Sequence, residues 1–189
     1  MGESAWRVDN EAHLLHFGGR TFRCDRDIEA SAGWKGHVLL LSSDTDCLSL
    51  WDGEGMICTT RVGVYPQDVA VQGDAAYICG GADGKLHVLS LPDLHTAAEF
   101  ALPGMPERLC LWGSAAYVLT LLVEPDVHTA LLSVAGDAGR WSEIARFEGI
   151  PEGVVADGSG LWVMLNEGVV RLRWKEMRQK RRHQRQENG

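Results

Sequence analysis

The chain has 189 residues, of which 45% are hydrophobic and 23% charged, and its net charge is −8. This is the balance of an ordinary globular domain, with enough residues for one sizeable core, and it argues against disorder. The longest apolar stretches, such as residues 115–123, are far too short to span a bilayer. The start of the chain lacks a basic segment followed by an apolar one, as a signal peptide would have. A soluble, cytoplasmic protein is therefore expected.

The first predicted elements are two short strands, residues 13–17 and 20–24, which flank Gly18-Gly19. A Gly pair between two apolar segments predicts a tight hairpin turn. Further along, residues 38–41 read Val-Leu-Leu-Leu without alternation. A short run of this kind is typical of a strand whose two faces are both covered. The chain therefore opens with strands of a sheet that has neighbours on both sides.

Residues 68–102 give the clearest series of strands. Turn residues at 72–74, 83–84 and 92–93 separate four segments rich in apolar and aromatic side chains. These signals predict a four-stranded antiparallel unit with strands at residues 68–71, 75–79, 85–91 and 97–102. Helical periodicity is absent from the sequence before residue 175.

The same unit recurs along the chain. A Pro is followed seven residues later by Gly and eleven residues later by an aromatic residue in three places, which are Pro66-Gly73-Tyr77, Pro106-Gly113-Tyr117 and Pro151-Gly158-Trp162. The period is 40 residues for the first step and 45 for the second. A degenerate copy fits residues 28–41, with Gly33 in the Gly position. Repeats of this length predict one sheet per repeat in a radial array.

Two motifs resemble those of a known family. The segment from Arg61 to Val71 resembles the start of a YVTN-type β-propeller repeat, and residues 77–80 and 117–120 match its Tyr-Val-Thr-Asn signature loosely. The segment 46–52 ends in Trp51-Asp52, which is similar to the Trp-Asp pair of WD repeats. The resemblance covers residues 28–174. It implies the architecture, and the family hosts binding scaffolds, surface proteins and a few enzymes, so it implies no particular activity.

The expected fold is therefore all-β, a β-propeller of about four blades with four antiparallel strands each. The N-terminal strands resemble the outer half of a blade, and residues 153–174 resemble the inner part of one. We therefore expect the N-terminal strands to close the C-terminal blade and leave no free edge. Two rings are compatible with this prediction: a four-bladed monomer, or half of an eight-bladed homodimer, and the resemblance favours larger rings.

The candidate site lies where the repeated Pro leads into the innermost strand, beside the central channel. The equivalent residues at this place are Gln67, Asp68, Glu107, Arg108 and Glu152. Three carboxylates and a guanidinium that converge near the axis could bind a cation or a polar ligand. The alternative is that they are ordinary solvated loop residues.

No cofactor, metal or catalytic motif is recognisable in the sequence. Residues 80–85 resemble a phosphate loop but have Cys79 at the first required Gly and Leu86 in place of Ser or Thr, so a turn is expected. The His residues follow no ligand pattern; His13 and His16 would face opposite sides of a strand. The five Cys include no CxxC pair and are expected to be small buried hydrophobes.

Charge divides the chain into a predicted propeller, residues 1–174, and a basic tail, residues 175–189. The tail carries six Lys or Arg against two Glu, which leaves 12 basic and 24 acidic side chains in the rest of the chain. The tail has no apolar face and is expected to be helical or disordered. An acidic body repels phosphate, so nucleic acid is an expected partner only through the tail.

Two functions are compatible with these observations. The first is a non-enzymatic scaffold that binds a protein or peptide, with exposed Trp and Tyr as anchors. The alternative is a lyase- or hydrolase-like propeller with chemistry at the channel mouth, through Asp68, Glu107, Arg108 or Glu152. Seven buried Trp would argue against the scaffold, whereas carboxylates that meet around a pocket would favour the enzyme. A homodimer, as in the larger ring, is compatible with either function.

Overall fold

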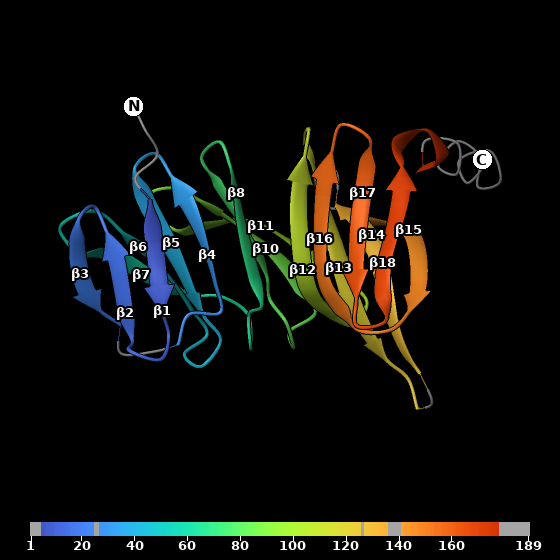
Figure 1. Ribbon diagram of the computed structural model, residues 1–189, viewed down its shortest axis with the longest axis horizontal. Coiled ribbons are helices and arrows are strands. Elements are labelled where there is room, and N and C mark those ends of the chain that lie inside the picture. Colours follow the sequence, from blue (N-terminus) through green and yellow to red (C-terminus); the bar gives the residue numbers. More distant parts are fainter. Residues whose placement is uncertain (1–4, 25–26, 126, 136–140, 178–189) are drawn as a thin grey trace.

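The computed structural model describes residues 5–24, 27–125, 127–135 and 141–177, and it is nearly all β (Figure 1). Its strands form five antiparallel sheets, numbered here in chain order. The first sheet holds β1 (Trp6–Asp9), β2 (Leu14–Phe17) and β3 (Arg20–Arg23). The second holds β4 (Ala30–Trp34), β5 (His37–Ser42), β6 (Cys47–Trp51) and β7 (Met56–Arg61).

The third sheet holds β8 (Asp68–Gln72), β9 (Ala75–Cys79), β10 (Lys85–Ser90) and β11 (His95–Ala101). The fourth holds β12 (Met105–Trp112), β13 (Ala115–Val123), β14 (His128–Ala135) and β15 (Trp141–Glu148). The fifth holds β16 (Pro151–Asp157), β17 (Gly160–Leu165) and β18 (Gly168–Arg173), and a helical turn follows at residues 174–177. The all-β propeller expectation is confirmed, and the predicted strands of the third sheet agree with the observed ones to within two residues.

The sheets stack on one another through their apolar faces. In the part of the chain that the structure describes, four apolar clusters fill the spaces between successive sheets. The run at residues 38–41 shows why: Val38 and Leu40 belong to the cluster shared with the first sheet, whereas Leu39 and Leu41 belong to the cluster shared with the third. All four side chains are at most 1% exposed. The expectation of a strand covered on both faces is therefore confirmed.

The repeated Gly has a structural role at the turns after β8 and β12. Gly73 and Gly113 adopt positive φ angles of 59° and 61°, which favour Gly. Their carbonyl oxygens each accept a hydrogen bond from the preceding sheet: Trp34 Nε1 donates to Gly73 at 3.1 Å, and Gln72 Nε2 donates to Gly113 at 2.5 Å. At Gly73 and Gly113 the repeated offset thus coincides with a contact that joins one sheet to the next.

One expectation about the fold was wrong. The N-terminal strands do not close the C-terminal blade, because β1–β3 form a sheet of their own, which lies at the opposite end of the long axis from β16–β18 (Figure 1). The reason is the packing of the first sheet on the second. Trp6 Nε1 donates to Ser31 Oγ at 3.0 Å, and its ring occupies the space that a side chain at Gly33 would need. The described residues therefore form five sheets, where about four blades were expected.

Candidate functional site

The predicted channel-mouth residues lie at irregularities where the inner strands begin. Glu107 of β12 has no pairing partner in β13, and Glu152 of β16 has none in β17, although the residues on either side of each are paired. Gln67 and its neighbour Asp68 both face Cys79 of β9, since the Gln67 amide donates to the Cys79 carbonyl and Asp68 pairs with it. An extra residue at the same repeat position is a β-bulge, a feature common beside functional sites. The structure therefore places the candidates at equivalent points of adjacent strands.

Arg108 connects these bulges across three sheets. Its Nη1 donates to the carbonyl oxygen of Glu107 at 2.9 Å and to that of Gln67 at 3.5 Å. Its Nε donates to the carbonyl oxygen of Glu152 at 3.1 Å. The guanidinium is thus engaged with the main chain of the third, fourth and fifth sheets, so it holds the inner strands together at the mouth.

Asp68 makes a second connection between inner strands. Its Oδ2 accepts a hydrogen bond from the Leu109 amide of β12 at 2.9 Å, and its Oδ1 accepts one from the Val69 amide. Burial raises the pKa of the Asp68 carboxyl, while these amides and Arg108 act in the opposite direction. Burial also raises the pKa of Glu107, and Arg108 opposes that shift. The carboxyls are electrostatically perturbed, but the atoms of Asp68 are occupied by main-chain donors.

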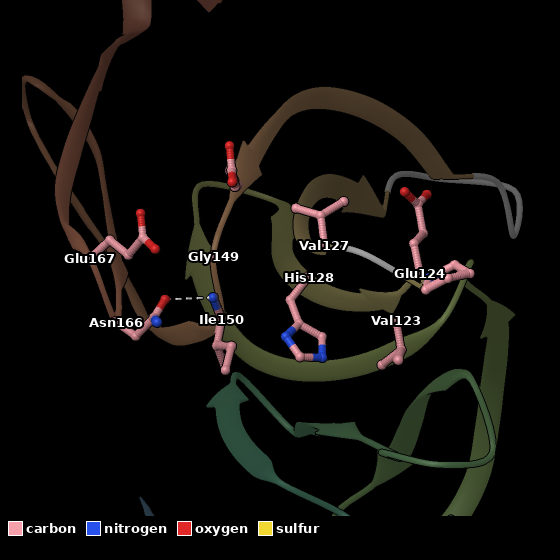
Figure 2. Close-up of a pocket in the computed structure, with 10 residues that line it drawn as sticks. Val123, Glu124, Val127, His128, Gly149, Ile150, Asn166 and Glu167 are labelled. Carbon is pink, nitrogen blue, oxygen red and sulfur yellow. Dashed lines mark hydrogen bonds between the residues drawn. The ribbon is translucent and has the colours of Figure 1, made fainter.

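A pocket that the sequence did not indicate lies on the same face, where the fourth and fifth sheets meet (Figure 2). Its volume is about 600 Å³, in the range of small-ligand sites. Its polar lining comes from Glu124, His128, Glu148 and Glu167, and its lining also includes the apolar Val123 and Ile150. In Figure 2, His128 stands between Ile150 and Val123, with Glu124 and Glu167 on opposite sides of the pocket. The pocket therefore combines carboxylates with exposed apolar surface.

The wall of this pocket is held in place by main-chain contacts. Asn166 Oδ1 accepts a hydrogen bond from the Ile150 amide at 2.7 Å, and the Ile150 carbonyl accepts one from the Asn166 amide at 3.1 Å (Figure 2). The Gly149 amide donates to the His128 carbonyl at 2.8 Å. Gly149 has a φ of 123°, and a Cβ there would lie 2.8 Å from Asn166 Oδ1. Only Gly therefore allows the segment at residue 149 to lie this close to Asn166.

One signal in the sequence could have indicated this pocket. The step from Pro106 to Pro151 is five residues longer than the step from Pro66 to Pro106. The extra residues lengthen β13 and β14 of the fourth sheet relative to β9 and β10 of the third. The longer hairpin carries Val123, Glu124 and His128 to the pocket.

Exposed aromatic and apolar side chains occur on the face that carries these loops. Tyr65 and Ile150 both precede the repeated Pro and are 62% and 39% exposed. Tyr65 has a positive φ of 55°, which is strained for a residue other than Gly, and its amide donates to Asp46 Oδ1 at 2.9 Å. None of the seven Trp is fully buried, but Trp112 and Trp141, which are 41% and 37% exposed, lie at the ends of β12 and β15 that are remote from these loops. The Trp are therefore not all buried, and the exposed aromatic side chains are divided between the two ends of the sheets.

The other candidate groups have structural contacts. His87 is buried between Asp83 and Glu99, with Nε2 2.7 Å from Asp83 Oδ2 and Nδ1 3.0 Å from Glu99 Oε1. Residues 80–85 form the turn between β9 and β10, as expected. The five Cys are free thiols, and the described residues contain no group of three or more His, Cys, Asp or Glu that could hold a metal ion. Among these residues, no helix has the length and apolar character that a membrane crossing requires.

The comparisons with known proteins show the fold alone. No protein-family model matches the chain, and no curated protein matches it. Similar solved structures are of the β-propeller type. Hydrazine synthase from Kuenenia stuttgartiensis has a TM-score of 0.66 and 13% identity over 92% of this chain, which spans 63% of that chain. BamB from Moraxella catarrhalis has a TM-score of 0.56 and 11% identity over 94% of this chain and 68% of its own.

A designed protein is also similar. The computationally designed Ika4 protein has a TM-score of 0.66 and 11% identity, over 79% of this chain and 92% of its own. The chain thus spans less than two thirds of the hydrazine synthase chain and nearly all of the designed one. At these identities, the activity of a similar protein does not transfer to this chain.

Proposed function

We propose that the chain is a non-enzymatic scaffold whose loop face binds a basic segment of a protein partner. The loop face is the face where β8, β12 and β16 begin, which carries the bulges of β12 and β16 and the pocket of Figure 2. The observation that supports this proposal is the pocket, in which Glu124, Glu148 and Glu167 lie beside exposed Val123 and Ile150. A Lys or Arg side chain matches such a site, because it has an apolar stem and a charged head.

The rest of the loop face agrees with a protein partner. Tyr65 is exposed on a strained, hydrogen-bonded loop, so binding would require little ordering of its main chain. Aromatic side chains of this kind are enriched among residues that dominate binding energy. The acidic body of the chain would also attract a basic segment over a distance comparable with the Debye length.

The alternative of a lyase or hydrolase at the channel mouth has weaker support. General acid–base catalysis needs side chains with atoms available to a substrate. Arg108 and Asp68 direct their polar atoms to main-chain groups of the inner strands instead. The raised pKa values of Asp68 and Glu107 have burial as their largest cause, which a structural role also explains.

The proposal can be tested with a labelled peptide of alternating Lys and Leu, by fluorescence anisotropy at low salt. We expect the triple variant Glu124→Gln/Glu148→Gln/Glu167→Gln to bind the peptide at least ten-fold more weakly than the wild type. The matched control replaces three exposed Glu outside the pocket, Glu11, Glu54 and Glu176, with Gln. Because both variants lose the same charge, equal weakening in the two would show that the pocket has no specific role and would overturn the proposal.

A further inference from the structure

In the part of the chain that the structure describes, the fifth sheet has one strand fewer than the second, third and fourth sheets. The second, third and fourth sheets end in the outer strands β7, β11 and β15, whereas the fifth sheet ends at its third strand, β18. Among the residues that the structure describes, no strand pairs with the outer edge of β18. An unpaired edge presents a row of main-chain donors and acceptors that can pair with another chain.

The register of β18 shows which main-chain groups are available. A two-residue turn, Asn166-Glu167, places Gly168 opposite Leu165, and pairing continues to Arg173 opposite Gly160. In such a hairpin, alternate residues bond to the partner strand, beginning with Gly168. The Trp174 amide, which has the same parity, donates to the Ser159 carbonyl at 3.3 Å. The amides and carbonyls of Val169, Arg171 and Arg173 therefore point away from β17.

The side chains along this edge are basic and partly apolar. Val169 is 62% exposed, and Arg171 and Arg173 follow on the same face at alternate positions. The Arg171 guanidinium lies over the Trp162 ring, 4.8 Å from its centroid, and Trp162 Nε1 donates to Asp157 Oδ2. The edge thus has one cation, Arg171, held over an aromatic ring, and a second, Arg173, two residues along the same face.

This charge excludes the occupants that the chain itself offers. Antiparallel pairing of β18 with a second copy, centred on Arg171, would set like charges opposite one another, which destabilises a sheet. Strand β3, at the edge of the three-stranded first sheet, begins and ends with arginines, Arg20 and Arg23. Residues 178–189 contain five Lys or Arg and a single Glu. A strand with carboxylates at alternate positions has the complementary charge.

We propose that the outer edge of β18 binds an extended acidic segment of a partner protein, which becomes the fourth strand of the fifth sheet. Carboxylates of this strand would lie opposite Arg171 and Arg173. Apolar side chains between them would lie beside Val170 and Leu172, which pack against the cluster between the fourth and fifth sheets. In the fourth sheet, the corresponding strand β15 contributes Ile144 and Phe147 to that cluster. The edge is separate from the pocket on the loop face, so it would be a second interaction surface.

The test uses the full chain and a fluorescein-labelled peptide, Thr-Glu-Ile-Glu-Phe-Val-Thr, written to run antiparallel to β18. We expect saturable binding by the wild type, with at least a ten-fold loss when the peptide amides that face β18 are N-methylated. The variant Arg171→Glu/Arg173→Glu should have an affinity for the acidic peptide at least ten-fold lower than that of the wild type. It should instead bind the analogue that has Lys in place of Glu. Circular dichroism checks that each variant is folded.

The matched control reverses the charges of β3 in the variant Arg20→Glu/Arg23→Glu. Its affinity for the acidic peptide should be within two-fold of that of the wild type. Three results would overturn the proposal: no binding to the wild type, equal binding of the N-methylated peptide, or equal losses in the two charge-reversed variants. The last result would mean that only the overall charge of the chain matters.

Discussion

Arg108→Met is the substitution that best tests the role of Arg108 between the inner strands. The change keeps an apolar stem of similar length and removes the donors to the carbonyls of Gln67, Glu107 and Glu152. Hydrogen bonds from a charged group contribute roughly 1.5–3 kcal/mol each. Two of these bonds are short, the third is long at 3.5 Å, and the site is partly open to solvent. We therefore expect a loss of about 2–3 kcal/mol in the free energy of unfolding, since solvent replaces part of what is lost.

The assay is urea unfolding followed by Trp fluorescence and by circular dichroism. Coincident transitions show that a two-state free energy can be taken from the curves. In thermal unfolding, the same loss lowers the midpoint by about 4–12 °C for a chain of this size.

The control for this experiment is Arg146→Met. Arg146 has both Nε and Nη2 within 3.0 Å of Glu143, yet the two residues form an exposed pair on a single strand, and such pairs contribute little to stability. If Arg108→Met destabilises the chain by less than about 0.5 kcal/mol, or by no more than Arg146→Met, Arg108 does not hold the inner strands together.

Three further predictions follow from the packing and burial. Gly160→Ala should lower the free energy of unfolding in urea by about 2 kcal/mol or more, because a Cβ at this position overlaps the Leu172 carbonyl. Gly158→Ala should change the same free energy by less than about 1 kcal/mol, because the space around Gly158 is open. Equal effects of the two substitutions would contradict the close packing of Gly160 on Leu172. Burial raises the pKa of Cys110 to about 12, so a thiol reagent at pH 8 should modify the half-exposed Cys47 first, and early loss of Cys110 would refute this order. Burial raises the pKa of Asp68, so its contribution to stability is greatest at low pH and falls as pH rises above about 4. The free energy of unfolding of the wild type should therefore fall relative to that of Asp68→Asn as the pH is raised above about 4. A difference between the two free energies that does not change with pH would contradict the burial of this carboxyl.

The repeat made the inner part of the fold predictable from the sequence. The Gly offset coincides with local turns of positive φ at Gly73 and Gly113 and with a contact between neighbouring sheets, such as that of Trp34 with Gly73. The unalternating run at residues 38–41 indicated two covered faces because each face packs on a different sheet.

The pairing of the N-terminal strands was not predictable in the same way. Whether β1 joins β18 or stacks beside β4 depends on contacts between segments far apart in the chain, here Trp6 with Ser31 and Gly33. Strand propensity is the same in both arrangements. The pocket escaped prediction for a similar reason, since Glu124, Glu148 and Glu167 come from three separate segments, and the longer step from Pro106 to Pro151 marks only the segment that carries Glu124.

The unpaired edge of β18 is tested most directly by amide hydrogen exchange, measured residue by residue by NMR. Exchange is slow for amides that are bonded within a sheet and fast for amides that face solvent. The amides of Val170 and Leu172 should be protected, and those of Val169, Arg171 and Arg173 should exchange quickly and become protected when the acidic peptide is added. Uniform protection along β18 without peptide would contradict an open edge.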